Sequence, residues 1–255
     1  MDAWESALAK FLEQWKGRKD VEGALVAGSY AWGCPTKYSD IDVHIVLSDK
    51  VNWRKRGNAV VDGFLIEYFA NPPRQLKQYM KEDYASGKKT DAAMFSRGRI
   101  LFDKRGEIKK LRQFAKRELK KKFVMLRGAE LEIAKYMLWD GLDNLNDLQD
   151  QKSPGFNLLY NLLLEKVIST YAKYLGVEVA SPAKLYNFFT SEKFRKAYGM
   201  AAFPDKKFVK LVSVCFKQHG RRSFKAIEKL IWYSLCEMGN FKVDGWKIRT
   251  PLKLE

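Results

Sequence analysis

The spacing of apolar residues changes within the first thirty positions of the chain. From Trp4 to Trp15, apolar side chains recur at intervals of three or four residues, and Gly17 follows them. This spacing predicts an opening amphipathic helix that ends near the glycine. The apolar run VEGALVAGS, residues 21–29, then predicts a short buried strand that ends at Gly28.

Strand periodicity continues in the next segments. In SDIDVHIVLS, residues 39–48, polar and apolar positions alternate, so a strand would place Asp40, Asp42, His44 and Val46 on one face. Residues 58–73 contain two apolar runs joined at Asp62 and Gly63, a dipeptide typical of tight hairpin turns. A helix from the prolines at 72 and 73 and a strand over GRILFD, residues 98–103, complete a mixed region with about five strands.

Helical periodicity is nearly continuous from Ile108 onward. Segments with Pro and Gly separate five predicted helices, at residues 108–126, 128–150, 155–175, 204–218 and 221–238. The pattern therefore predicts an α+β protein. A domain of residues 1–107 would hold a mixed sheet with flanking helices, and residues 108–255 would form an all-helical bundle domain.

The composition is that of a folded protein with reduced thiols. With 255 residues, 46% of them hydrophobic, the chain can bury a sizeable core. No apolar run reaches the ~18 residues of a membrane span, and no secretory signal is evident, so we expect a cytoplasmic protein without membrane association. Cys34, Cys215 and Cys236 lack CxxC spacing, and the two histidines, His44 and His219, are too far apart to suggest a histidine metal site.

The net charge of +17 lies mostly after residue 107. The segment IKKLRQFAKRELKKKFVMLR, residues 108–127, carries nine Lys or Arg and one Glu. Such a balance indicates attraction to nucleotides, nucleic acid or an anionic surface. It is equally typical of solvated helix faces that keep a protein soluble, and both interpretations stay open here.

Candidate chemistry is concentrated in GSYAWGCPTKYSDID, residues 28–42. Asp40 and Asp42 would project from one face of a strand, about 6 to 7 Å apart at the backbone, close enough to share a divalent cation such as Mg²⁺. Gly28 and Ser29 form a small turn whose backbone N–H groups and hydroxyl could contact a phosphate. Glu67 is a single charge inside an apolar strand and is either a third metal ligand or a solvent-facing residue.

This order of motifs resembles the nucleotidyltransferase fold of the polymerase β type. The small catalytic domain followed by a helical domain is similar to the aminoglycoside nucleotidyltransferases of the kanamycin type, and GRILFDKRGEI is similar to the strand and turn that close their catalytic domain. The resemblance is specific over about residues 21–107 and only architectural beyond them. Relatives often dimerise, which makes a homodimer an expectation for this chain.

The resemblance implies a site for two Mg²⁺ ions and a nucleoside triphosphate. It assigns Asp40, Asp42 and Glu67 to the metals, and Gly28, Ser29, Lys37 and Ser39 to the nucleotide. Many relatives carry a basic residue in the helical turn after Gly-Ser. This chain has Tyr30 and Trp32 there, which leaves Lys37 to neutralise triphosphate charge.

The helical half offers candidates for a general base or for acceptor binding, chiefly Asp140 and Asp143. They belong to an acidic stripe with Asp147, and Glu132 lies nearby on the same predicted helix. Tyr136 and Trp139 could stack on sugar rings of a cationic acceptor. The alternatives are an exposed acidic stripe and core aromatic residues. His44 could hydrogen-bond a metal-ligand carboxylate or be structural.

Three functions follow from these observations. The first is transfer of AMP from ATP to a hydroxyl of a small molecule, such as an aminoglycoside-like antibiotic, with release of pyrophosphate and resistance as the consequence. The second keeps the reaction but uses RNA or protein as acceptor, as in toxin–antitoxin or RNA-tailing enzymes, and the basic run supports it. The third is a nucleotide-binding module without turnover. An RNase motif around His219 is not evident.

Overall fold

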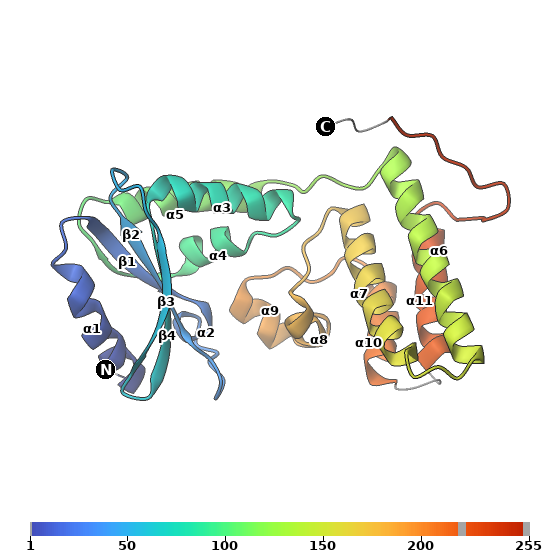
Figure 1. The fold of residues 1–255 in the computed structure, drawn as a ribbon, viewed down its shortest axis with the longest axis horizontal. Coiled ribbons are helices and arrows are strands. Elements are labelled where there is room, and N and C mark those ends of the chain that lie inside the picture. Colours follow the sequence, from blue (N-terminus) through green and yellow to red (C-terminus); the bar gives the residue numbers. More distant parts are fainter. Residues whose placement is uncertain (1, 219–222, 252–255) are drawn as a thin grey trace. The chain divides into compact units, whose positions relative to one another are not determined.

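The computed structural model describes residues 2–218 and 223–251. The chain forms two compact units, as Figure 1 shows. The first contains residues Met1–Lys121 together with Ala197–Gly199, and the second contains Lys122–Lys196 and Met200–Glu255. The first unit is a mixed sheet with helices and the second is helical, so the α+β class predicted from the sequence is confirmed.

A five-stranded sheet organises the N-terminal unit, with strand order β3-β4-β2-β1-β5. The strands β2 and β4 pair in parallel, whereas the other neighbours are antiparallel. This places β2 at the centre of the sheet with β1 and β4 beside it (Figure 1). The strand bounds are β1 Val21–Ala27, β2 Ile41–Leu47, β3 Lys55–Val61, β4 Phe64–Asn71 and β5 Arg99–Asp103.

Helices cover both faces of this sheet. The predicted opening helix is α1, Ala3–Lys16, whose apolar side chains Leu8, Phe11 and Trp15 pack on one face. The other face is covered by α3 Pro73–Ala85, α4 Thr90–Arg97 and α5 Glu107–Lys120. Of these helices α4 was not predicted. Because both faces are covered, the polar as well as the aliphatic face of β2 is largely buried.

The predicted hairpin is confirmed at Asp62 and Gly63. Their φ angles are 49° and 82°, the pair of positive values that a two-residue turn matching the strand twist requires. The turn sets the pairing of Val61 with Phe64, and from there the antiparallel register of β3 and β4 follows. This register determines which residue of β3 lies beside Glu67.

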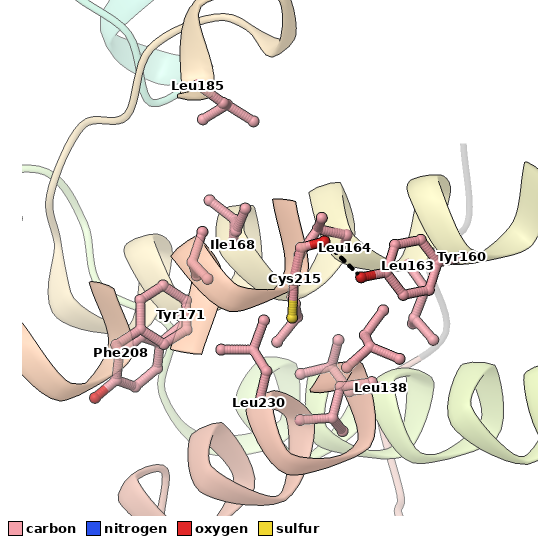
Figure 2. Close-up of a cluster of buried hydrophobic side chains, with 14 of the residues drawn as sticks. Leu138, Tyr160, Leu163, Leu164, Ile168, Tyr171, Leu185, Phe208, Cys215 and Leu230 are labelled. Carbon is pink, nitrogen blue, oxygen red and sulfur yellow. Dashed lines mark hydrogen bonds between the residues drawn. The ribbon is translucent and has the colours of Figure 1, made fainter. Parts of the chain in front are cut away.

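The C-terminal unit is built from helices that share one apolar core. Tyr160, Leu163, Tyr171 and Phe208 belong to this core, and the Tyr160 hydroxyl donates to the carbonyl oxygen of Cys215 at 2.9 Å, as Figure 2 shows. The helices are α6 Gly128–Asp150, α7 Phe156–Leu175, α8 Leu185–Thr190, α9 Glu192–Tyr198, α10 Lys206–Lys217 and α11 Phe224–Glu237, with a 3-10 turn at Pro182–Lys184. The last two residues of α9 are grouped with the first unit. The short helices α8 and α9 were not predicted.

The helix predicted over residues 108–126 ends early, at Lys120. Lys121 is extended, and the Lys89 ammonium donates to the Leu119 carbonyl oxygen at 2.8 Å, where the helix leaves its last carbonyls unpaired. The α5 helix packs against α3 and α4, so it belongs to the first unit. The boundary between the units therefore lies between residues 121 and 122, whereas the sequence predicted it after residue 107. In the described residues, no helix combines the length and apolar character that spanning a bilayer requires.

Candidate metal centre

Strand register brings the predicted acidic residues together. In the parallel pair of β2 and β4, Asp42 is the direct partner of Glu67, and across the antiparallel pair with β1 it lies opposite Ala27. Residues that are partners in a sheet project from the same face. Asp42 and Glu67 therefore lie side by side, and Asp42 also lies next to the point where β1 ends in the Gly-Ser turn.

Asp40 completes a cluster of three carboxylates. One oxygen from each of Asp40, Asp42 and Glu67 lies within 4.8 Å of the others, and all three residues are half-buried. No other trio of His, Cys, Asp or Glu in the described chain brings ligand atoms this close. Three negative charges at this separation repel one another, and an all-oxygen donor set is the kind that Mg²⁺ prefers, so the cluster suits a divalent cation.

Arg56 from β3 contacts this cluster and was not predicted. Its Nε donates to Glu67 Oε1 at 3.0 Å, and its Nη2 donates to the same oxygen. The guanidinium lies 4.9 Å from the centre of the Phe69 ring. This arrangement orients the Glu67 carboxylate and offsets part of the charge. The contact arises from the hairpin register, since Arg56 faces Phe69, two positions after Glu67 on β4.

Gly28 is the point where the turn and the carboxylates meet. Its φ is +67°, and a Cβ placed on it would lie 1.9 Å from Asp42 Oδ2. Any other residue would be strained in this conformation and would push the carboxylate away. The sequence predicted that a residue without Cβ is needed here so that a phosphate can approach. In the structure, the group that lies closest to the Cβ position is the Asp42 carboxylate.

The remaining residues proposed for the nucleotide lie in and after the turn. Ser29 is half-buried in α2, Gly28–Ala31, and its carbonyl oxygen accepts from the Cys34 amide at 2.9 Å. The Ser39 hydroxyl accepts from the Thr36 amide at 2.8 Å, so in this structure it stabilises the loop before β2. Lys37 is exposed, with its ammonium 5.5 Å from the Tyr38 ring centre.

A second arginine, Arg97 at the end of α4, was also missed. Its guanidinium lies 4.8 Å from the centre of the Trp32 ring, one residue beyond α2. Nη2 donates to the Ala197 carbonyl oxygen at 2.5 Å, within the same unit, whereas Nη1 is buried and has no hydrogen-bond partner in the described residues. Burial lowers the pKa of this guanidinium, although an arginine remains charged at neutral pH. Nothing in the local sequence indicates this stacking, because Trp32 and Arg97 are far apart in the chain.

His44 lies on the Asp42 face of β2 but makes no hydrogen bond among the described residues. Its ring stacks on Phe69 at 5.3 Å and meets Phe95 edge-on at 5.0 Å, and both ring nitrogens are buried without partners. Burial lowers its pKa to about 4, so the imidazole is neutral at pH 7. Of the two interpretations made from the sequence, the structure shows the structural histidine and no bond to a metal-ligand carboxylate.

The acidic residues of the helical unit are separated along α6. Glu132 pairs with Lys135 at 2.6 Å, and Asp140 accepts a hydrogen bond from the Asn144 side chain at 3.2 Å. Asp143 lines a small pocket together with Trp139. One face of the Tyr136 ring is covered by Trp246, at 4.4 Å between ring centres.

Comparison with known proteins agrees with this geometry. Residues 7–126 match the family model described as a nucleotidyltransferase domain. A solved structure to which the chain is similar is the nucleotidyltransferase-like protein from Exiguobacterium sibiricum 255-15, at 10% identity and a TM-score of 0.45, covering 93% of this chain and 77% of that chain. The search of curated proteins found no match. Residues 7–126 thus match a nucleotidyltransferase domain, and this match supports an enzyme of the nucleotidyltransferase class.

Proposed function

We propose that this protein transfers AMP from ATP to a hydroxyl group of a small molecule and releases pyrophosphate, with Mg²⁺ bound at the carboxylate cluster. The observation that carries the proposal is the convergence of Asp40, Asp42 and Glu67 within 4.8 Å, next to the turn at Gly28. In the reaction the acceptor oxygen forms a bond to the α-phosphorus while the bond to the bridging oxygen of pyrophosphate breaks.

The carboxylates would hold up to two Mg²⁺ ions, which lower the pKa of an attacking hydroxyl and offset charge on the phosphates. Arg56 orients Glu67 for this role by donating to Oε1. The Gly28 turn allows the triphosphate to approach the backbone closely, and the Ser29 hydroxyl is a donor for it.

Arg97 is our candidate for the basic residue missing from the turn. Its unpaired Nη1 is a buried donor, and a buried guanidinium nitrogen without a partner is costly unless a ligand accepts from it. Stacking on Trp32 holds the guanidinium beside the residues that follow Ser29. Lys37 is a second, exposed cation in the same loop region. Together they would supply the charge that binds a triphosphate.

The acceptor is proposed to bind in the helical domain, with Asp140 and Asp143 as candidates for acceptor binding or for the base that takes the hydroxyl proton. An amine-rich acceptor of the aminoglycoside class suits acidic side chains. The basic run that favoured RNA is partly used within the fold. Arg112 donates to the Phe95 carbonyl oxygen at 3.2 Å, and Lys121 pairs with Glu118 at 2.6 Å.

The test is an acceptor panel with the full chain. The protein is incubated with ATP labelled at the α-phosphate, Mg²⁺, and in turn kanamycin, lincomycin, transfer RNA and a protein extract. The proposal predicts label on a small molecule and none with the Asp42→Asn variant. Label on RNA or protein would show that the acceptor is a macromolecule and not a small molecule. No label from ATP on any acceptor would overturn the proposed reaction in favour of a binding module.

A further inference from the structure

A small pocket lies in the helical unit between α6 and α11, helices that pack against each other. From α6 it is lined by Trp139, Asp143 and Asn146, which recur at helical spacing on one side of the helix. From α11 it is lined by Phe224, Glu228 and Trp232, spaced by four residues each. Each helix therefore contributes one tryptophan and one carboxylate to the same pocket.

The two carboxylates have no cationic partner in the part of the chain that the structure describes. Neither Asp143 nor Glu228 makes an ion pair or a hydrogen bond to another described residue, although Lys and Arg outnumber Asp and Glu by 47 to 30. Lys225 and Lys229, the nearest basic residues of α11 in sequence, are exposed and do not pair with Glu228. The pocket is thus an acidic site in a strongly basic protein.

The tryptophans add a second, independent feature. Trp232 is 44% exposed, so its indole ring is accessible to a ligand in the pocket. The Trp139 ring also contacts the Phe241 ring, at 6.2 Å between ring centres. Indole faces attract cations, and together with carboxylates they select an ammonium group attached to an apolar body.

The volume limits the size of the ligand. The pocket measures about 170 Å³. An apolar cavity of about 150 Å³ holds one benzene molecule, so this pocket accommodates a single six-membered ring or a short alkyl chain. Its negative charge would repel a phosphate.

From these observations we infer that the pocket between α6 and α11 binds a small organic ammonium compound, with Asp143 and Glu228 pairing with the charge and Trp139 and Trp232 contacting the apolar body. The inference deepens the proposed function, because such a compound, or an aminated ring of a larger one, is a candidate acceptor. Only that link rests on the proposed function. Binding itself needs neither nucleotide nor metal.

The test is a binding measurement on the full chain without nucleotide or metal. Cyclohexylamine, which is protonated at pH 7.5, is titrated by calorimetry and by tryptophan fluorescence, and cyclohexanol serves as a neutral probe of similar shape. We expect cyclohexylammonium to bind at least about tenfold more tightly than cyclohexanol, since only the cation gains from the carboxylates and indole faces. Equal affinities, or no saturable binding of the amine, would overturn the inference.

Matched variants locate the site. The double variant Asp143→Asn with Glu228→Gln keeps the shape of both side chains and should weaken amine binding about tenfold or more while leaving cyclohexanol unchanged. Asp147→Asn, an exposed acid of α6 outside the pocket, should leave both unchanged. Amine binding that survives the double variant would contradict the assignment. Transfer from labelled ATP, measured separately with the natural chain, tests the proposed reaction, so its failure is distinguishable from a failure of amine binding.

Discussion

Each of the two units contains a prominent acidic site, and the two sites differ in the groups that surround their carboxylates. In the helical unit, Asp205 accepts from the hydroxyls of Tyr171 and Tyr233, at 2.7 and 2.8 Å, and from the amides of Lys207 and Phe208, both at 2.9 Å. In the sheet unit, three carboxylates face one another and a single arginine contacts Glu67.

This difference separates structural from functional acidic groups. Burial of Asp205 favours its neutral form, but the hydrogen bonds to its carboxylate outweigh burial and hold its pKa below the ordinary value. Its oxygens are used by the fold. At the cluster of Asp40, Asp42 and Glu67, mutual repulsion is tolerated because a cation bound there would offset it. The close approach of three like charges therefore marks the candidate site.

The largest expected effect comes from removing one charge of the cluster. We predict that Asp42→Asn lowers the rate of nucleotidyl transfer about a thousandfold, because metal-based charge stabilisation is worth several kcal/mol, while leaving the fold intact. Transfer from α-labelled ATP and a urea unfolding curve measure the two quantities. Glu13→Gln, an exposed acid of α1, is the control. If Asp42→Asn retained transfer, the carboxylate cluster would not be the functional acidic site.

A second prediction separates the contact at Gly28 from backbone strain. Gly28→Ala should lower transfer about a hundredfold, because the new Cβ displaces the Asp42 carboxylate, and should also cost roughly 1 to 2 kcal/mol of stability. Gly63→Ala is the matched control. Gly63 also has a positive φ, of +82°, but nothing lies within 4 Å of its Cβ position. It should share the loss of stability and keep the activity, whereas equal activity losses would contradict the proposed contact.

A third prediction concerns the satisfied acid. Asp205→Ala should lower the free energy of unfolding of the helical unit by about 3 kcal/mol, because it removes the cap of α10 and leaves two tyrosine hydroxyls without their acceptor. Urea denaturation followed by far-UV circular dichroism measures this loss. Asp42→Asn should show no comparable change. A similar loss of stability in both variants would contradict the conclusion that Asp205 stabilises the fold and Asp42 does not.

The smallest predicted effect concerns His44 and the dependence of stability on pH. The unfolded histidine takes up a proton near its ordinary pKa of 6.5, but the folded one does so only at about 4, so native stability is lost as the pH falls through this window. The loss amounts to at most about 3 kcal/mol. His44→Leu should remove it.

Urea unfolding of the metal-free protein at pH 5 and pH 7.5 tests this prediction. The stability of His44→Leu relative to the natural chain should be greater at pH 5 than at pH 7.5. At both values it should gain from the removal of two unsatisfied ring nitrogens. Parallel changes of stability with pH in the two proteins would show that His44 does not titrate as described.

Much of the site was predictable because its signals are local. The Gly-Ser turn, the alternation that contains Asp40 and Asp42, and the turn at Asp62 and Gly63 each lie within a few residues, and backbone geometry links such short patterns to structure. Glu67 was predictable as a candidate because a single charge in an apolar strand needs a partner. The main helices after residue 107 were predictable because helical periodicity is also a local pattern.

The rest depends on contacts between distant residues. The register of β2 against β4 decides that Glu67 lies beside Asp42, and neither strand encodes that alignment alone. Arg56 and Arg97 reach their positions through a hairpin register and a helix packing that single-sequence patterns do not specify. The end of α5 at Lys120 depends in part on Lys89, which lies thirty positions before the Leu119 carbonyl that it contacts.

The most direct test of the central claim is a crystal structure of the full chain with Mn²⁺ and α,β-methylene ATP. The account predicts an anomalous manganese peak bonded to oxygens of Asp40, Asp42 and Glu67, with the triphosphate next to Gly28 and Ser29. Manganese and nucleotide bound elsewhere, with Glu67 directed away from the two aspartates, would contradict it.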